Sequence, residues 1–279
     1  MDLFLYKLFF NGDPTPGKIT KAFGITVSES GISSAHPIWL LALITLGFAI
    51  FGYLIGSLNF SLLISKHVFH DDVRRHGSHN AGSTNMKRVF GLSAGLMTLL
   101  GDALKGAVAA LIPMLLIGHT AGYIAGFFCI LGHCFPIFFK FKGGKGVATS
   151  IGVILAADPI VGIIILIIFA VTVVGTKYVS LGSIISALLF PLILDRVYSL
   201  SFGGDVHPPM LMIVSALLIT ISVVVAHHEN IKRLLSGTES KFSFRKKPDT
   251  GGTSPEKSAS RSLHHIDDDD DDVSDDKKD

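Results

Sequence analysis

Seven stretches of apolar residues between Ile38 and Ala226 most constrain how this chain can fold, because each is a candidate transmembrane helix. A helix needs about 20 mostly apolar residues to cross the hydrocarbon core of a membrane. Of the 279 residues, 49% are hydrophobic and 16% are charged, whereas a soluble domain carries about 25% charged residues. The sequence therefore predicts an all-α integral membrane protein and excludes a soluble, a disordered or a disulfide-stapled secreted one. The stretches are Ile38–Ser65, Leu92–Gly118, Ala121–Phe139, Val147–Asp158, Pro159–Thr176, Tyr178–Leu194 and Pro209–Ala226.

The number of spans depends on residues 147–176, which form either one long kinked helix or two short ones broken at Asp158-Pro159. Basic residues mark cytoplasmic loops, and basic clusters follow both the first span and the last. Both clusters lie on the same side only if an even number of spans separates them, which favours two short helices. The sequence thus predicts seven transmembrane helices with the N-terminus outside and the C-terminus cytoplasmic. Val147–Asp158 is the weak point, because 12 residues at ~1.5 Å each reach only about 18 Å.

The chain has three parts. Residues 1–37 form an N-terminal leader, in which 1–10 suggest an interfacial helix and not a signal peptide. Residues 38–240 form the seven-span domain. Residues 241–279 form a charged cytoplasmic tail that we expect to be disordered, because its composition cannot offset the entropy of ordering. A metal-binding role for His264, His265 and the run Asp267–Asp272 is the alternative for this tail.

Three polar segments fall on the same, cytoplasmic, side of this topology. The first, residues 75–88, combines glycines with hydroxyl and amide side chains, so its backbone and side-chain donors suit an anion. In it, Ser78, Asn80, Thr84 and Asn85 are candidate donors, and Arg88 offers a planar fork for phosphate oxygens. The alternative is that this segment is an ordinary polar turn between two spans and has no binding role.

The second segment, residues 132–149, places Gly143, Gly144 and Gly146 around Lys145 just before a helix. A helix N-terminus with a nearby lysine suits an anion. The spacing does not match a nucleotide-binding P-loop, so nucleotide hydrolysis is not expected. The alternative is a plain basic loop.

The third segment, residues 226–239, leaves the last span. His227, Asn230 and Arg233 would share one helix face at three-residue spacing, and His227 could act as a general base or as a phosphate donor. His228 is an adjacent alternative, and His133 is a further candidate that is more easily explained as structural.

Two ionisable residues lie inside the second span. Asp102 and Lys105 are three residues apart and can pair, since charges at membrane depth are costly when unpaired. The alternative is that Lys105 faces the anion site.

Together these segments resemble the motifs of the bacterial acyl-phosphate-dependent glycerol-3-phosphate acyltransferases. The resemblance covers roughly residues 48–240 in the order of that family. It rests on Gly77-Ser-His-Asn-Ala-Gly-Ser-Thr-Asn85, Gly132-His-Cys-Phe-Pro136, Phe141-Lys-Gly-Gly-Lys-Gly-Val-Ala-Thr149, His227-His-Glu-Asn-Ile-Lys-Arg-Leu234, Asp102-Ala-Leu-Lys-Gly106 and Lys177-Tyr-Val-Ser-Leu181. The sequence departs from the family's usual residues at His79, Ser83, Lys177 and His228.

The resemblance implies transfer of a fatty acyl group from acyl-phosphate to the 1-hydroxyl of glycerol 3-phosphate, giving lysophosphatidic acid and phosphate as the first step of phospholipid synthesis. It implies no cofactor, no metal and no nucleic-acid partner, a bacterial inner-membrane location among membrane lipids, and a functional link to the acyl-phosphate-forming enzyme. On this basis we expect four catalytic residues, His227, Ser78, Lys145 and Asn230. We expect the substrate-binding residues to be Asn80, Gly82, Thr84, Asn85, Arg88, Lys105, Gly143, Gly144, Ser180 and Ser183.

Two rival functions are considered. A transporter of anionic solutes could use the same glycine loops, although the sequence shows no inverted repeat. An enzyme that uses acyl-thioester donors is not favoured, because none of the three polar segments contains the His-x-x-x-x-Asp acceptor pattern.

Overall fold

A computed structural model of the chain describes residues 26–28, 31–33, 38–204 and 206–242, of which 26–28, 31–33, Ile38 and Leu41 are described by their backbone alone. The expected interfacial helix at residues 1–10 and the acidic tail from 243 onward lie outside the described residues.

The described elements are almost all helices. Two short strands, β1 (Thr26–Ser28) and β2 (Gly31–Ser33), pair antiparallel with Val27 opposite Ile32. The helices are α3 (Ile38–Gly56), α4 (Phe60–His67), α5 (Ser83–Phe90), α6 (Leu92–Leu116), α7 (His119–Cys134), α8 (Val147–Ala157), α9 (Pro159–Thr176), α10 (Val179–Ser201), α11 (Met210–Ala226) and α12 (His228–Leu235), with 3₁₀ turns at Val73–Arg75 and Ile137–Phe139.

Most helix boundaries follow local sequence signals that were readable in advance. Pro159 starts α9, where its fixed φ suits the first helical position, so the break at Asp158-Pro159 is confirmed. Two predicted boundaries are wrong. The first span is interrupted before α4, where the Asn59 side chain caps the new helix. Helix α10 continues seven residues beyond Leu194, because Asp195 and Arg196 do not end a helix that has left the apolar layer.

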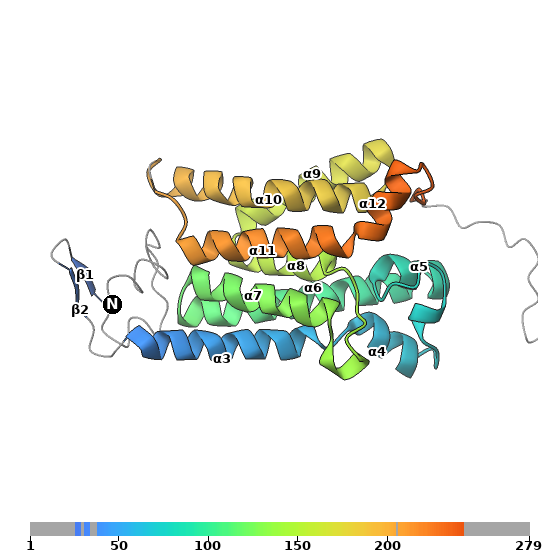
Figure 1. Cartoon of the computed structure of the whole chain (residues 1–279), viewed down its shortest axis with the longest axis horizontal. Coiled ribbons are helices and arrows are strands. Elements are labelled where there is room, and N and C mark those ends of the chain that lie inside the picture. Colours follow the sequence, from blue (N-terminus) through green and yellow to red (C-terminus); the bar gives the residue numbers. More distant parts are fainter. Residues whose placement is uncertain (1–25, 29–30, 34–37, 205, 243–279) are drawn as a thin grey trace, which may run out of the picture. The chain divides into compact units, whose positions relative to one another are not determined.

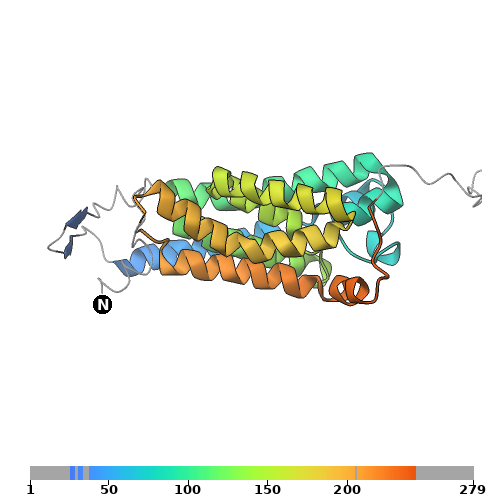
Figure 2. The ribbon, with the colours of Figure 1, turned by 90° about the horizontal axis from the view of Figure 1, so that it is seen from above.

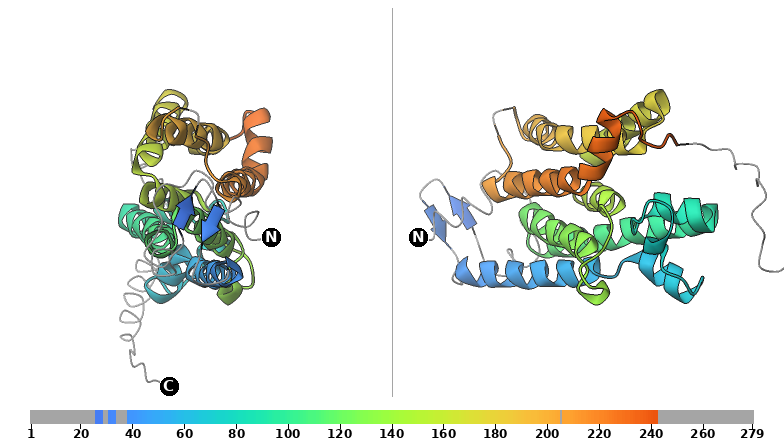
Figure 3. Two further views of the ribbon diagram at one scale, coloured as in Figure 1. Left: turned by 90° about the vertical axis from the view of Figure 1, so that its left-hand side faces the viewer. Right: turned by 45° about the vertical axis from the view of Figure 1, so that its right-hand side comes forward.

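Helix α7 lies at the centre of the helical bundle. It contacts α3, α6, α8 and α11, and it is the most buried of the candidate spans. Helices α9 and α10 pack against each other on the far side of α8 and α11, as the end-on view in Figure 3 (left) shows. Figure 2 shows the long helices running along one common direction.

Small residues allow the shortest apolar helix, α8, to pack closely on α6. A Cβ at Gly152 would strike the backbone carbonyl of Ala103, and a Cβ at Gly106 would strike that of Thr149. Close backbone approach at small residues is typical of helix pairs in membranes. The 11-residue α8 is therefore held by α6 and α7 despite its length.

Among the residues that the structure describes, five helical segments are long and apolar enough to cross a membrane, and α11 with α12 makes a sixth if the pair, bent by 57°, is one span. The structure thus supports an all-helical integral membrane protein with five or six candidate spans. The short helices α4, α5 and α12 gather at one end of the long helices (Figure 1). The three polar segments adjoin these short helices and the start of α8, so they meet at that end.

The α6–α8 contact gives a test of this packing. Substituting Gly152→Ala should destabilise the protein by about 1–3 kcal/mol, because the added methyl group overpacks a backbone contact. Gly175→Ala on α9 is the matched control, since nothing lies within 4 Å of a Cβ placed there. Thermal unfolding in detergent should show a lower Tm for the first variant only. Equal Tm values would contradict the close approach of the two helices.

Candidate active site

The first polar segment folds into a tight loop around the buried side chain of Asn85. The amide oxygen of Asn85 accepts a hydrogen bond from the backbone N–H of Ser78 at 2.9 Å. A Cβ at Gly77, where φ is +60°, would strike this oxygen. The amide nitrogen donates to three backbone carbonyls, those of Val73, His76 and Asn80, at 3.2, 3.0 and 3.1 Å. Asn85 therefore holds the loop and has little capacity left for a ligand.

Other donors of this loop remain on the surface. Ser78, Thr84 and Arg88 are exposed, and Asn80 is half-buried. Gly82 directly precedes α5 in an extended conformation. The hydroxyl group of Thr84 thus lies in the first turn of α5, where free backbone N–H groups favour an anion, and Arg88 lies in the last turn of the same helix.

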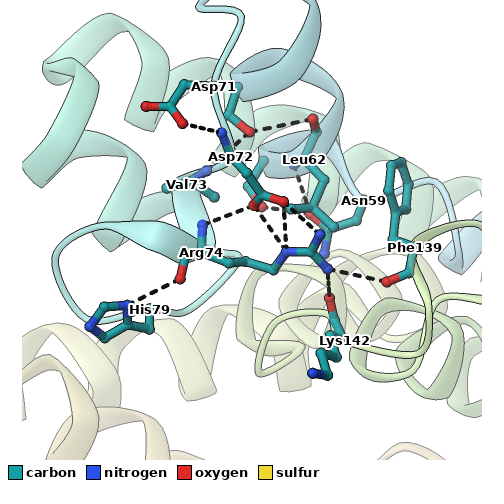
Figure 4. Close-up of polar contacts among 11 residues, drawn as sticks. Asn59, Leu62, Asp71, Asp72, Val73, Arg74, His79, Phe139 and Lys142 are labelled. Carbon is teal, nitrogen blue, oxygen red and sulfur yellow. Dashed lines mark hydrogen bonds and ion pairs between the residues drawn. The ribbon is translucent and has the colours of Figure 1, made fainter.

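Arg74 joins the first loop to the second (Figure 4). One edge of its guanidinium binds the carboxylate of Asp72, with the closest contact at 2.7 Å. Nη1 donates to the carbonyls of Phe139 at 3.1 Å and Lys142 at 2.9 Å. His79 Nδ1 also donates to the Arg74 carbonyl at 3.1 Å. The planar guanidinium group binds Asp72 and the two carbonyls simultaneously. Arg74 therefore fixes the first loop against the second.

The glycines of the second loop serve close packing. The backbone N–H of Gly143 donates to the carbonyl of Cys134 at 3.1 Å, and that of Gly144 donates to His133 at 3.2 Å. A Cβ at Gly144 would strike both the His133 ring and the carbonyl of Ala81 in the first loop. These two N–H groups are therefore used inside the protein, and the loop presents the side chain of Lys145.

Lys145 belongs to a cluster of donors from three elements. Its ammonium donates to the amide oxygen of Asn230 on α12. The carboxylate of Glu239 accepts 2.7 Å hydrogen bonds from Ser180 on α10, from Asn230 and from Arg233. Asn230 and Arg233 thus lie one turn apart on α12 and bind the same carboxylate, whereas His227, predicted on the same face, lies at the bend before this helix.

Burial and charge shift the pKa values of this cluster. Burial, together with the nearby Arg233 cation, lowers the pKa of Lys145 to about 8. Burial alone would raise the pKa of Glu239, but the hydrogen bonds from Ser180, Asn230 and Arg233 hold it below the ordinary value. Glu239 is therefore ionised at neutral pH, and it balances one of the two cations.

His227 lies beside this cluster, between α11 and α12. It is 3% exposed, and its Nδ1 donates to the carbonyl of Val223 at 2.7 Å. Burial lowers its pKa to about 4, so the ring is neutral at pH 7. Because Nδ1 carries the proton, Nε2 is the acceptor. His228, in contrast, is exposed and ion-pairs with Glu229 at 3.2 Å if protonated.

Contacts of Phe242 bring the third segment next to the other two. The backbone N–H of Phe242 donates to the carbonyl of Lys177, between α9 and α10, at 2.7 Å. The ammonium of Lys87 on α5 lies 4.1 Å from the centre of the Phe242 ring. The segment after α12 therefore spans from α10 to the first loop.

A narrow apolar crevice starts next to this cluster and runs between α8, α9, α10 and α11. Its lining includes Val147, two residues beyond Lys145, and Val223, whose carbonyl binds His227. It also includes Ser183, one turn beyond Ser180, and the buried Phe190. The site thus combines clustered phosphate-type donors, a neutral histidine and an apolar crevice.

Comparison with known proteins agrees with this combination. The family model for glycerol-3-phosphate acyltransferase matches residues 46–237. The chain belongs to the glycerol-3-phosphate acyltransferase family. The acyltransferase is 42% identical over 194 residues to glycerol-3-phosphate acyltransferase 2 of Bacillus anthracis, covering 69% of this chain and 96% of that protein. It is 42% identical over 195 residues to the glycerol-3-phosphate acyltransferase of Bacillus subtilis, covering 70% and 96%.

Solved structures also resemble the acyltransferase. The crystal structure of PlsY (YgiH), an integral membrane glycerol 3-phosphate acyltransferase, in its glycerol 3-phosphate form has a TM-score of 0.64 and 35% identity, covering 71% of this chain and 96% of that one. Its lysophosphatidic acid form has a TM-score of 0.62 and 34% identity, covering 71% and 95%.

The structure of the acyltransferase brings most expected residues together, but Lys105 stands apart. The Lys105 ammonium ion-pairs with Asp102 at 2.8 Å and contacts His133 Nδ1 at 3.0 Å. It also donates to the carbonyls of Gly56 and Leu58 at 3.0 and 2.9 Å. The predicted Asp102–Lys105 pair is present, and these protein acceptors use the ammonium donors. These contacts therefore fit a structural role for Lys105, in which it pairs with Asp102, better than a role in substrate binding.

Two functional side chains were not found from the sequence. Arg74 belongs to the basic cluster that follows the first span, and its spacing from Asp72 could have indicated a local pair. Glu239 was included in the third segment without a role. The signal for Glu239 was a lone acid just beyond a basic helix, since a carboxylate near Arg233 is readily paired.

The role of Asn85 can be tested with the isosteric variant Asn85→Asp. The variant keeps an acceptor for Ser78 but loses the N–H donors to three carbonyls, so we expect a loss of about 1–3 kcal/mol in stability and a large loss of acyltransferase activity. Tm and turnover are measured in parallel, with Ser93→Ala, exposed on α6, as the control. Wild-type values for Asn85→Asp would show that this amide does not hold the loop.

Proposed function

We propose that this glycerol-3-phosphate acyltransferase takes its acyl group from an acyl phosphate and transfers it directly to the 1-hydroxyl of glycerol 3-phosphate. The ester C–O bond forms, the bond between the acyl carbon and the phosphate oxygen breaks, and the hydroxyl proton passes to the phosphate of glycerol 3-phosphate. The products are lysophosphatidic acid and inorganic phosphate. The observation that carries this proposal is the cluster of Lys145, Asn230, Arg233 and Ser180 beside the neutral His227, at the mouth of an apolar crevice.

The first loop binds the phosphoryl group of the acyl phosphate in this proposal. Ser78, Thr84 and Arg88 supply exposed donors, and Gly82 leaves the N-terminal end of α5 open. Fixed donors of this kind stabilise the leaving phosphate and the oxyanion of the attacked carbonyl. Asn80 and Asn85 shape the loop.

Lys145 and Asn230 bind the phosphate of glycerol 3-phosphate, with Ser180 and Arg233 beside them. Glu239 positions the side chains of Asn230, Ser180 and Arg233 through its hydrogen bonds. Holding both substrates together supplies much of the rate acceleration, because a pre-activated donor needs mainly correct placement of the hydroxyl.

His227 orients the attacking hydroxyl. Its tautomer is fixed by Val223, so Nε2 accepts a hydrogen bond from the 1-hydroxyl. A base with a pKa of about 4 is weak at neutral pH, and a catalytic base works best with a pKa near the working pH. We therefore propose that the phosphate of glycerol 3-phosphate accepts the proton of the 1-hydroxyl. His227 positions this hydroxyl.

The acyl chain occupies the crevice between α8, α9, α10 and α11. The crevice begins at Val147 and Val223 next to the donor cluster and is lined mostly by apolar side chains. This placement puts the chain in the lipid-facing half of the site and the phosphate at its polar end. A carrier, in contrast, needs a binding site near the middle of the membrane that opens to both sides.

Seven spans fit the arrangement if α8 and α11 also cross. Helix α11 has 17 residues, or about 26 Å, and α8 has 11 residues, or about 17 Å. We propose the N-terminus outside and the site on the cytoplasmic side of a bacterial inner membrane, since basic residues flank that end. Residues 38–240 form the catalytic domain, between a leader and a charged tail.

The reaction is tested with purified protein, glycerol 3-phosphate and palmitoyl phosphate. Phosphate release that requires both substrates, together with lysophosphatidic acid formation, supports the proposal. Palmitoyl-CoA in place of palmitoyl phosphate should give no product. Activity only with the thioester would overturn the assignment of the donor.

Substituting His227→Ala should reduce turnover by about 10²-fold, the effect expected when a reacting hydroxyl is misplaced by about 1 Å. His228→Ala is the matched control, because this neighbour is exposed and should retain most activity. Steady-state assays of both variants decide the point. Near-normal turnover of His227→Ala would remove its role.

Lys145 should govern the alkaline limb of the pH profile. Its pKa of about 8 keeps the ammonium charged below that pH and neutral above it, so kcat/KM for glycerol 3-phosphate should fall as the pH rises through about 8. Lys145→Arg keeps the charge, and its decline should move to higher pH. An unchanged profile in Lys145→Arg would assign the limb to another group.

The proposed orientation is tested by labelling single cysteines in intact cells. Cysteines at His76, Lys140 and His228 should react with an impermeant reagent only after permeabilisation, whereas a cysteine at the exposed Leu200 should react at once. The native Cys129 and Cys134 are buried. Labelling of the first three positions in sealed cells would contradict the orientation.

A further inference from the structure

The connection between α7 and the second loop exposes large apolar side chains among lysines. Over residues 135–141, the exposed fractions are 55% for Phe135, 47% for Ile137, 58% for Phe138 and 56% for Phe141. The 3₁₀ turn Ile137–Phe139 has no buried residue. A loop that met only water would leave this apolar surface unfavourably hydrated.

The length of α7 places this connection at the membrane boundary. Its 16 residues rise about 24 Å, less than the ~30 Å of a typical hydrocarbon core. The residues directly after Cys134 must therefore lie within or at the edge of the lipid layer.

The backbone of the connection is prepared for such a setting. Phe139 and Phe141 both donate their N–H groups to the Pro136 carbonyl, at 3.1 and 3.0 Å. The carbonyls of Phe139 and Lys142 accept hydrogen bonds from Arg74. Non-helical backbone tolerates an apolar environment only when its polar groups are bonded within the protein.

Three basic side chains surround the apolar residues. Lys140 and Lys142 are exposed on either side of Phe141, and the ammonium of Lys66 on α4 lies 5.3 Å from the centre of the Phe139 ring. Basic residues near a membrane surface attract anionic head groups, and phenylalanine side chains of interfacial segments enter the boundary between head groups and acyl chains.

We propose that residues 135–142 form an interfacial anchor, in which the apolar side chains enter the lipid and Lys66, Lys140 and Lys142 bind anionic phospholipid head groups. The anchor continues directly into Gly143, Gly144 and Lys145. It therefore holds the second loop at the depth of lipid phosphates. This inference rests on the membrane-spanning α7 and is independent of which acyl donor the enzyme uses.

Tryptophan fluorescence measures the insertion directly. In a Trp39→Phe background, which removes the only native tryptophan, Phe138→Trp and Phe141→Trp are reconstituted separately into vesicles. We expect blue-shifted emission and strong quenching by phospholipids brominated near the head-group end of the acyl chain. Glu229→Trp, at an exposed position on α12 beside Lys232, is the control and should be quenched by aqueous iodide instead.

Iodide quenching of both anchor tryptophans to the level of the control would overturn the insertion and leave this face to a protein partner. Phe135→Trp and Ile137→Trp serve if either variant fails to fold, as judged by Tm.

Head-group binding is tested with spin-labelled phosphatidylglycerol and phosphatidylcholine. The preference for phosphatidylglycerol should fall about fivefold for each lysine lost, from the ~1 kcal/mol typical of a basic residue at an anionic surface, in Lys140→Gln and Lys142→Gln. Lys232→Gln on α12 is the matched control and should keep the wild-type preference. An equal preference in all proteins would overturn the head-group assignment.

Discussion

The hydrogen bonds of Arg74 to the carbonyls of Phe139 and Lys142 fix the geometry on which the rest of the site depends. They join a loop that precedes α5 to a loop that precedes α8. Asp72 neutralises the guanidinium and fixes its orientation, so the arginine is used as a structural fork and not as a free charge. Close contact of Gly144 with Ala81 and His133 strengthens the same junction. If the two substrates bind to these two loops, Arg74 sets the distance between them.

A membrane protein must build such a site with few free polar groups, and most polar groups of this site are accordingly bonded within the protein. The buried Lys105 is paired with Asp102 and bonded to two carbonyls, and the partly exposed Arg233 is paired with Glu239. Unpaired charge would be costly in a low-dielectric setting. The glycines likewise bring backbones together at the α6–α8 crossing and at the second loop. Lys145 and the surface donors near α5 remain as the groups best placed to meet an anion.

The fold was largely predictable, because apolar length and proline breaks are local signals. The division into α8 and α9 at Asp158-Pro159 followed from such a signal. The site was predictable as a set of segments but less so residue by residue. Asn85 and Gly144 were expected to contact substrate, and in the structure their polar groups bond within the protein. The full role of Glu239 needed the fold, because its partner Ser180 on α10 is distant in sequence, although Arg233 on α12 is near.

The central claim is that both substrates are held at once where the three polar segments meet, and that the acyl group passes directly between them. Initial rates measured while varying palmitoyl phosphate at several fixed concentrations of glycerol 3-phosphate test it most directly. Direct transfer predicts double-reciprocal lines that intersect and no phosphate release from palmitoyl phosphate alone. Parallel lines with a burst of phosphate before the acceptor is added would reveal an acyl-enzyme and contradict the account.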